Sequence, residues 1–206
     1  MNWRNLLLQK KFRTELIITI ILLAFILFAL SHFLIYVERR RGIVLNDPVL
    51  NQFEPINLTW LIFSLIYLSL TLAVIDLTKD PKRMLFVIQA YILMIAVRIA
   101  AMYVVPLDPP QNMIALNDPF VQLFGTGKPL TKDLFFSGHT ATLFLLYMGT
   151  KRILLKRIFL IFTITVGISV LLQHVHYTAD VLVAPFAAYG CYSLAGYLRS
   201  ELDYSL

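Results

Sequence analysis

The sequence predicts an all-α integral membrane protein built from a bundle of six transmembrane helices. Of its 206 residues, 59% are hydrophobic, and the mean hydropathy is +0.75. This apolar share is well above that of a soluble domain. The apolar residues gather in long runs, and backbone groups in hydrocarbon must pair within their own segment, which favours helices. The length leaves no room for a second, sizeable soluble domain.

The first apolar run extends from Leu16 to Val37 and follows a polar, basic segment, residues 1–15. The run is long enough to cross about 30 Å of hydrocarbon. It is too long for the apolar region of a signal peptide and lacks a clear small-residue cleavage site, so we expect a retained helix.

Five more spans are predicted, at Leu58–Leu77, Met84–Val105, Leu134–Met148, Ile158–Leu172 and Val181–Leu198. The Leu134–Met148 and Ile158–Leu172 runs are short, and they cross a bilayer only if their helices include the polar residues at their ends. Asp76, near one end of the second span, is expected to be solvated. Residues 16–198 are thus predicted to form the catalytic membrane domain, and residues 199–206 a cytoplasmic tail.

Basic residues predict the orientation. Of the 18 Lys and Arg residues, 12 fall on one side of the predicted bundle and 5 on the other, and Arg98 lies inside the third span. The positive-inside rule then places both termini in the cytoplasm, and we expect a bacterial inner membrane. The cluster Arg39–Arg41 opposes the rule. The net charge of +6 fits this orientation and contact with anionic lipids, and we expect no nucleic acid partner.

Two polar segments at the predicted outer face interrupt the apolar pattern. Residues 133–140 read DLFFSGHT, residues 174–180 read HVHYTAD, and together they hold three of the four histidines. His32, the fourth, is expected to be merely interfacial. The outer loop 106–132 between the third and fourth spans is rich in Pro and Gly, and its length favours a lid.

These segments hold the candidate catalytic residues. His176 and Asp180 are four residues apart and would share one face of a helix. A carboxylate beside an imidazole fixes its tautomer and leaves the other ring nitrogen free to attack. His139 is the candidate general acid and base.

Three further residues are candidates for binding a phosphate group. Ser137 and Gly138 precede the fourth span, where helix N–H groups and the helix dipole attract anions. Arg98 would supply a permanent charge and a bidentate fork, although it is also able to snorkel to the interface.

The remaining polar residues leave alternatives open. Asp133 either caps a helix or supports the site, His174 is either an accessory residue or only a neighbour, and Tyr177 is a further accessory candidate. Cys191 is the only cysteine, so no thiolate metal site and no intrachain disulfide can form. We predict no metal and no cofactor.

The segments 133–140 and 176–181 together resemble the sphingomyelin synthase branch of the type 2 phosphatidic acid phosphatase (PAP2) superfamily. The stretch from Arg98 to Leu107 resembles that branch's upstream motif. The resemblance implies a PAP2-like helical bundle in which His176 is the nucleophile, Asp180 orients it and His139 transfers protons. It also implies transfer of phosphocholine or phosphoethanolamine from a glycerophospholipid to a lipid alcohol such as ceramide, through a phosphohistidine-type intermediate, with release of diacylglycerol.

Departures from the superfamily bear on the alternatives. Phe136 stands where general lipid phosphatases have Pro, and Ser169 is followed by Val170 instead of Arg. Both argue against the plain phosphatase branch, but a lipid phosphatase or phospholipase C that uses water as acceptor would need the same histidines. A non-catalytic lipid-binding or transport protein is the second alternative, for which we find no inverted repeat. The expected partners are membrane lipids, and no oligomeric state is predicted.

Overall fold

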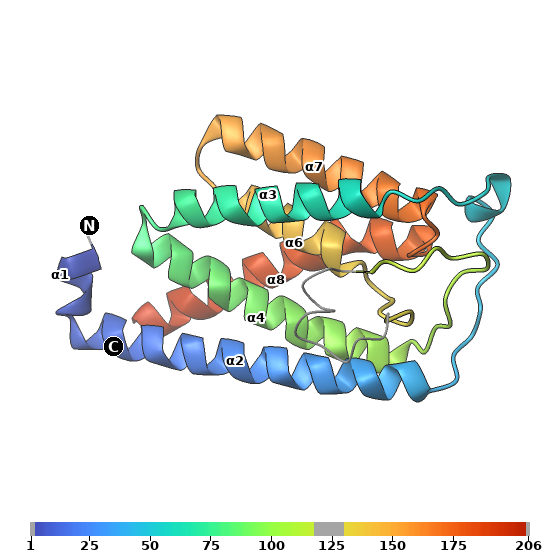
Figure 1. Cartoon of the computed structure of the whole chain (residues 1–206). Coiled ribbons are helices and arrows are strands. Elements are labelled where there is room, and N and C mark those ends of the chain that lie inside the picture. Colours follow the sequence, from blue (N-terminus) through green and yellow to red (C-terminus); the bar gives the residue numbers. More distant parts are fainter. Residues whose placement is uncertain (1–2, 118–129, 205–206) are drawn as a thin grey trace.

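The computed structural model describes residues 3–117 and 130–204, and this part of the chain is helical (Figure 1). Its helices are α1 (Trp3–Leu7), α2 (Lys10–Arg39), the 3-10 turn η1 (Leu50–Gln52), α3 (Thr59–Leu77), α4 (Pro81–Val104), α6 (Gly138–Gly149), α7 (Ile153–Leu172) and α8 (Thr178–Tyr204). The described residues contain no strand beyond a single bridge between Ile43 and Leu107. The all-α prediction is therefore confirmed.

Five of these helices, α2, α3, α4, α7 and α8, are long and apolar enough to cross a membrane. Helix α6 matches the predicted fourth span but has only 12 residues, because the helix begins after Ser137 and not at Leu134. At about 1.5 Å per residue it covers roughly 18 Å, less than the hydrocarbon thickness. The predicted fifth span starts five residues too late, since α7 begins at Ile153, and α8 continues beyond Leu198.

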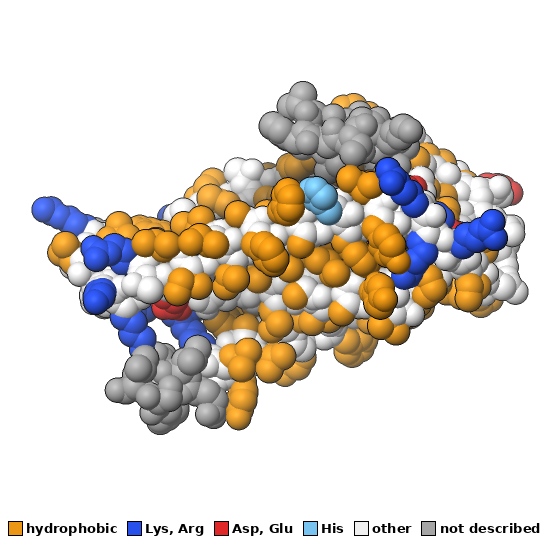
Figure 2. Space-filling model, turned by 90° about the horizontal axis from the view of Figure 1, so that it is seen from below, with side chains coloured by type: hydrophobic (Ala, Val, Ile, Leu, Met, Phe, Trp, Pro, Cys, Tyr) orange, Lys and Arg blue, Asp and Glu red, His pale blue; other side chains and the backbone are white. Residues whose placement is uncertain are grey.

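The short helix α6 lies inside the bundle. It packs against α7, α8 and α4, whereas α3 lies against α7 and α2 lies along α4 (Figure 1). The most apolar window of α2 is only 6% buried, against 22–33% in the other candidate spans. Helix α2 is thus the most peripheral of the long helices, and hydrophobic side chains cover the face shown in Figure 2 between its two ends.

Local sequence sets the ends of several helices. Asp80 caps α4 by accepting a hydrogen bond from Arg83 N at 3.3 Å, and Pro81 occupies the first helical position, where its missing N–H has no cost. Helix α7 ends at Leu172, and two residues later His174 has a left-handed φ of 56°, while Val175 N donates to Val170 O at 2.9 Å. This is the Schellman pattern in which Gly is usual.

The end of the bundle away from the histidines holds a buried carboxylate. Asp76 is 2% exposed, and its carboxylate accepts from Thr150 Oγ1 at 2.8 Å. It also pairs with Arg83 Nη2 at 3.3 Å and with Arg152 Nε at 3.1 Å. The expectation that Asp76 is solvated is wrong, because the connections after α3 and α6 meet over it and enclose its charge.

Arg40, from the basic cluster Arg39–Arg41 that opposes the positive-inside rule, has a structural role at the other end of the bundle. Arg40 donates from Nη1 to Tyr103 O at 2.8 Å and from Nη2 to Met102 O at 2.9 Å. These are carbonyls in the last turn of α4, where a cation is stabilised by the helix dipole. Arg40 therefore fastens the end of α2 to the end of α4.

Candidate active site

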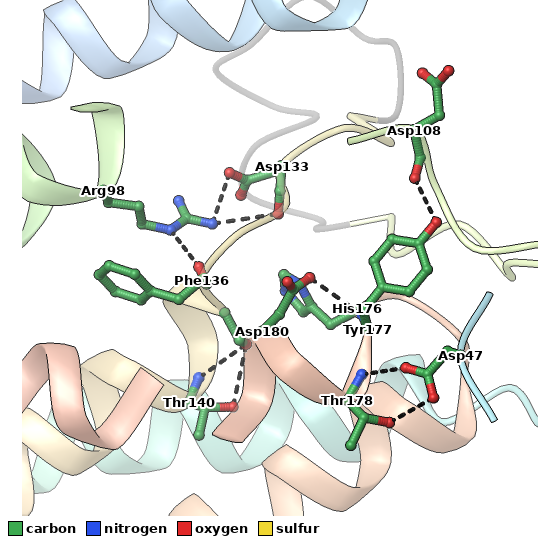
Figure 3. Close-up of polar contacts among 11 residues, drawn as sticks. Asp47, Arg98, Asp108, Asp133, Phe136, Thr140, His176, Tyr177, Thr178 and Asp180 are labelled. Carbon is green, nitrogen blue, oxygen red and sulfur yellow. Dashed lines mark hydrogen bonds and ion pairs between the residues drawn. The ribbon is translucent and has the colours of Figure 1, made fainter. Parts of the chain in front are cut away.

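The N-terminal ends of α6 and α8 meet at the histidine-bearing end of the bundle. Ser137 N, just before α6, donates to the carbonyl oxygen of Asp180 in the first turn of α8 at 3.1 Å. This bond joins the two polar segments singled out in the sequence, and Figure 3 shows Phe136 and Thr140 of one segment close to His176 and Asp180 of the other. Two helix N-termini, each with a partial positive charge, therefore point into one small region.

His176 and Asp180 form a buried pair. Nδ1 of His176 lies 3.3 Å from Oδ2 of Asp180, and the two side chains are 1% and 0% exposed. They do not share a helix face as expected, because α8 begins only at Thr178. Instead, Asp180 is the third residue of α8, and its Oδ2 also accepts from Tyr177 N at 3.2 Å, which caps the helix. One carboxylate thus holds both the helix start and the imidazole.

The second predicted histidine lies beside the first. The ring centroids of His139 and His176 are 6.0 Å apart, with planes at 64°. His139 is the second residue of α6, and its ring also lies edge-on to Phe63 of α3, 6.5 Å away. Because Nδ1 of His176 faces Asp180, Nε2 of His176 is the nitrogen left to react. The spacing allows one phosphoryl group to contact both rings.

Arg98 reaches the start of α6 from α4. Nε donates to Phe136 O at 3.0 Å, and Nη2 lies 2.7 Å from Asp133 Oδ1 and 3.4 Å from Asp133 O. The side chain is 6% exposed. Its Nη1 makes no hydrogen bond to any residue that the structure describes. The guanidinium is therefore fixed in orientation while one of its nitrogens keeps donors for a further acceptor.

Gly138 permits this approach. A Cβ atom at this position would lie 2.8 Å from Arg98 Cζ and 3.1 Å from both Nε and Nη2. Glycine alone lets a guanidinium lie directly against the first residue of the helix. The arrangement places a full positive charge beside the positive end of α6, which favours an anion at this position.

Asp133 is the counter-charge to Arg98. Burial raises the pKa of the Asp133 carboxyl, but the nearby Arg98 charge and its hydrogen bond outweigh burial and leave the pKa below its usual value. Asp133 is thus an anion that orients the guanidinium, and it does not cap α6. That role belongs to Ser137, whose Oγ accepts from Thr140 N at 3.4 Å and from Thr140 Oγ1 at 3.2 Å.

The cap changes what the start of α6 offers to a phosphate. The Ser137 hydroxyl is fully buried and bonded to Thr140, and the Ser137 N–H is bonded to Asp180 O. Neither group of Ser137 points to an incoming ligand. Among the described residues, the Gly138 N–H has no hydrogen-bond partner, so Gly138 is the better phosphate-binding candidate of the two.

The accessory candidates lie beside the histidine pair, against the loops at this end of the bundle. The Tyr177 hydroxyl donates to Asp108 O at 2.8 Å and accepts from Leu45 N at 3.1 Å, so it fastens two loops over the site. The ring of His174 packs edge-on to Phe53, its Nδ1 lies 3.2 Å from Gln111 O, and the residue borders a cavity of about 400 Å³. His174 lies two residues beyond the end of α7, and these contacts join it to the loops and not to the His176–Asp180 pair.

Sequence reasoning missed Asp47. Its carboxylate accepts from Thr178 N at 2.7 Å and Thr178 Oγ1 at 3.0 Å, and it also accepts from Val49 N and Leu50 N. Asp-Pro in a loop indicates a local turn, which the last two bonds make. Nothing local reveals that the same carboxylate caps α8 beside His176.

A second missed carboxylate holds the segment that carries Asp133. Glu38, near the end of α2, accepts from Thr131 N, Thr131 Oγ1 and Lys132 N at 2.5–3.3 Å. Lys132 in turn lies 2.6 Å from Asp108. Segment 130–133 is thereby tied to α2 and to the loop after α4, which holds Asp133 beside Arg98.

The predicted lid lies only partly within the described structure. Residues 106–117 and 130–132 are described, and Ile114 is bonded through its backbone to Gln173 at the end of α7. The central residues 118–129, including Pro119, Gly125, Gly127, Lys128 and Pro129, lie outside it. The lid therefore remains a prediction. No group of three or more His, Cys, Asp or Glu among the described residues could hold a metal ion.

Comparison with known families agrees with this arrangement. Residues 132–197 match the family model described as PAP2 superfamily C-terminal, which covers 66 of the 206 residues. The match includes His139, His176 and Asp180, and it supports membership of the PAP2 superfamily. No curated protein and no solved structure matches the chain. Members of that superfamily are generally lipid phosphatases or phosphotransferases, and the match together with the apolar helices supports an integral membrane protein.

Proposed function

We propose that this protein transfers the phospho-head group of a glycerophospholipid to a lipid alcohol such as ceramide, in the manner of the sphingomyelin synthase branch. The observation that carries the proposal is the His176–Asp180 pair with His139 beside it, 6.0 Å from ring to ring. A nucleophilic histidine that is oriented by a carboxylate, with a second histidine to carry protons, suits a covalent transfer in two steps.

In the first step, Nε2 of His176 attacks phosphorus and the bond from phosphorus to the diacylglycerol oxygen breaks. Asp180 accepts the hydrogen bond from Nδ1–H and stabilises the positive charge that develops on the imidazole. Protonated His139 gives its proton to the leaving oxygen, so that neutral diacylglycerol departs. Arg98 and the Gly138 N–H lie where they could balance the charge on the phosphoryl oxygens.

In the second step, the hydroxyl oxygen of the acceptor attacks phosphorus and the bond between phosphorus and His176 breaks. His139, now neutral, takes the hydroxyl proton and returns to its starting state. Water in place of the lipid alcohol would give a free phospho-head group by the same steps. The acceptor therefore decides between a transferase and a phospholipase C.

Two features of the chain support a lipid acceptor over water. The site lies at the end of a bundle whose outward side chains are apolar, so we expect membrane lipids beside it. The sequence also has Phe136 where general lipid phosphatases have Pro, and Phe136 is 2% exposed with its carbonyl oxygen bonded to Arg98.

The test is a product assay with purified protein and head-group-labelled phosphatidylcholine or phosphatidylethanolamine, with and without ceramide. We expect labelled phosphosphingolipid and diacylglycerol only when ceramide is present. Release of water-soluble labelled head group, unchanged by ceramide, would identify a phospholipase C. No turnover of either donor under any condition would contradict catalysis of head-group transfer from these lipids.

A further inference from the structure

A groove of about 940 Å³ lies on the side of α4 that faces away from the histidines. Its walls are α2 and α8, which both pack on α4 and leave the space between them open. The groove is lined on α4 by residues such as Ala96, whereas Arg98 points to the site. Residues two apart on a helix project about 200° apart, so groove and site are on opposite faces of α4.

The lining changes in character along the groove. Lys10, Lys11 and Arg199 lie at the end of the bundle, and Leu22 and Ala96 lie deepest. From Lys11 to Leu22 the axis of α2 rises about 16 Å, which is roughly half of the hydrocarbon thickness. The groove therefore runs from one membrane surface to about the middle of the bilayer.

Polar contacts occupy the zone between the basic end and the apolar depth. Gln89 Nε2 donates to Glu15 Oε1 at 3.0 Å and to Thr19 Oγ1 at 3.1 Å. Arg199 Nη2 lies 3.5 Å from the same Glu15 oxygen. Three basic side chains and this one acidic side chain are the charged groups in the described lining, so the end of the groove has an excess of positive charge.

We propose that this groove binds one phospholipid with an anionic head group, taken from the membrane leaflet at this end of the bundle. The order along the groove is basic, then polar, then apolar, which is the order of head group, glycerol ester region and acyl chain in such a lipid. Basic pockets between membrane helices recognise anionic head groups in this way. Figure 2 shows Lys and Arg side chains gathered at this end of the molecule, with hydrophobic side chains beyond them.

This assignment is independent of the reaction proposed above, because the groove shares no residue with the histidine site. Its volume falls in the range of ligand pockets, about 300–1,000 Å³. A zwitterionic lipid would fill the apolar part equally well but would gain less from the excess positive charge. We therefore expect the groove to bind a lipid with an anionic head group more tightly than a zwitterionic lipid.

The experiment is native mass spectrometry of the delipidated, full-length protein titrated with phosphatidylglycerol or phosphatidylcholine. We expect the wild type to bind one phosphatidylglycerol in preference to phosphatidylcholine. The double substitution Lys10→Gln/Lys11→Gln should weaken phosphatidylglycerol binding by about thirtyfold. This estimate assumes that each lysine contributes the usual attraction of one basic residue to an anionic membrane surface. Ala96→Trp, which fills the deep end, should abolish binding of both lipids at that site.

Matched controls are available at the same end and depth. Arg4→Gln/Arg13→Gln removes two exposed charges from the same end but not from the groove, and Val97→Trp adds the same bulk at a neighbouring lipid-facing position. Both controls should keep wild-type binding. Equal affinity of the wild type for the two lipids, or equal losses in test and control variants, would overturn the proposal.

Discussion

The Arg98 guanidinium and the Gly138 backbone occupy adjoining space, with Arg98 Cζ only 2.8 Å from the place of a Cβ on Gly138. The guanidinium has little freedom to retreat, because Phe136 O and the Asp133 carboxylate hold it from the other side. The start of α6 and Arg98, the only basic residue in the C-terminal half of α4, are therefore matched to each other in shape.

We expect Gly138→Ala to lower activity by about 10²-fold, the loss typical of displacing a positioned group by about 1 Å. The matched control is Gly190→Ala in α8, where a Cβ would meet nothing within 4 Å and activity should be unchanged. Head-group transfer by the two purified variants measures the difference. Full activity of Gly138→Ala would show that the position of Arg98 does not matter to turnover.

The two histidines should separate in a trapping experiment. His176→Ala should form no labelled enzyme, since Nε2 of His176 is the proposed nucleophile. With a p-nitrophenyl phosphocholine donor, whose leaving group needs no proton, His139→Ala should still acquire label but fail to pass it to an alcohol. Peptide mapping of the trapped label locates it, and label on His139 would reverse the assignment.

Asp180→Asn should leave the fold intact and lower the rate by up to about 10⁴-fold. The amide oxygen can still accept from Tyr177 N, so the helix cap survives, but the amide cannot stabilise the imidazolium of His176. Thermal unfolding and activity should be measured on the same sample. If Asp180→Asn does not fold, the cap on α8 requires the negative charge. Asp180→Glu, which keeps the charge, would then be the variant whose rate is compared with that of the wild type.

Stability should fall in acid through the Asp133–Arg98 pair. The folded-state pKa of Asp133 is lowered, so its contribution is fully present above the unfolded value of about 3.9 and is lost as the pH falls through the folded pKa. Thermal unfolding between pH 7 and pH 3 should show a steeper loss below about pH 4 in wild type than in Asp133→Asn. Identical slopes would mean that the pair adds nothing to stability.

The buried carboxylate at the opposite end should matter for stability and not for chemistry. Asp76→Ala removes the carboxylate that Arg83 and Arg152 share and leaves Arg83 with only the carboxylate of Asp80, 3.7 Å away, so we expect a loss on the order of 2–3 kcal/mol. Lys151→Ala, with a side chain 79% exposed, should change stability by about 0.5 kcal/mol or less. Activity per folded molecule should match wild type in both variants, as measured after correction for the folded fraction.

Topology can be tested with cysteines on a Cys191→Ala background. We predict that Gln111→Cys reacts with an impermeant thiol reagent in intact cells, while Lys151→Cys reacts only after the membrane is opened. Both positions are exposed and lie at opposite ends of the bundle. The reverse pattern would place the histidines in the cytoplasm.

Some of the site was predictable because it is local in sequence. His176 and Asp180 are four residues apart, and the start of α6 follows from Ser-Gly after a polar segment. The expected shared helix face was nevertheless wrong, because α8 begins only at Thr178 and His176 lies just outside the helix. The predicted contact between Asp180 and His176 is present, but Asp180 makes it from the first turn of α8 to a residue that precedes the helix.

The remaining contacts depend on tertiary structure. Asp47 reaches Thr178 across 131 residues of sequence, and Glu38 reaches Thr131 across 93. Asp47 stands in a loop and Glu38 directly follows the apolar run that ends at Val37, so a solvated side chain is the ordinary expectation for both. The burial of Asp76 escaped prediction for the same reason, since two separate connections enclose it.

The peripheral place of α2 bears on the order in which the bundle is built. Because α2 is apolar on nearly every side, it is stable across a bilayer before any neighbour exists. In chain order, α3 lies between α2 and its main partner, α4. The docking of α2 through Glu38 and Arg40 can therefore be completed only after α4 and segment 130–133 have been made.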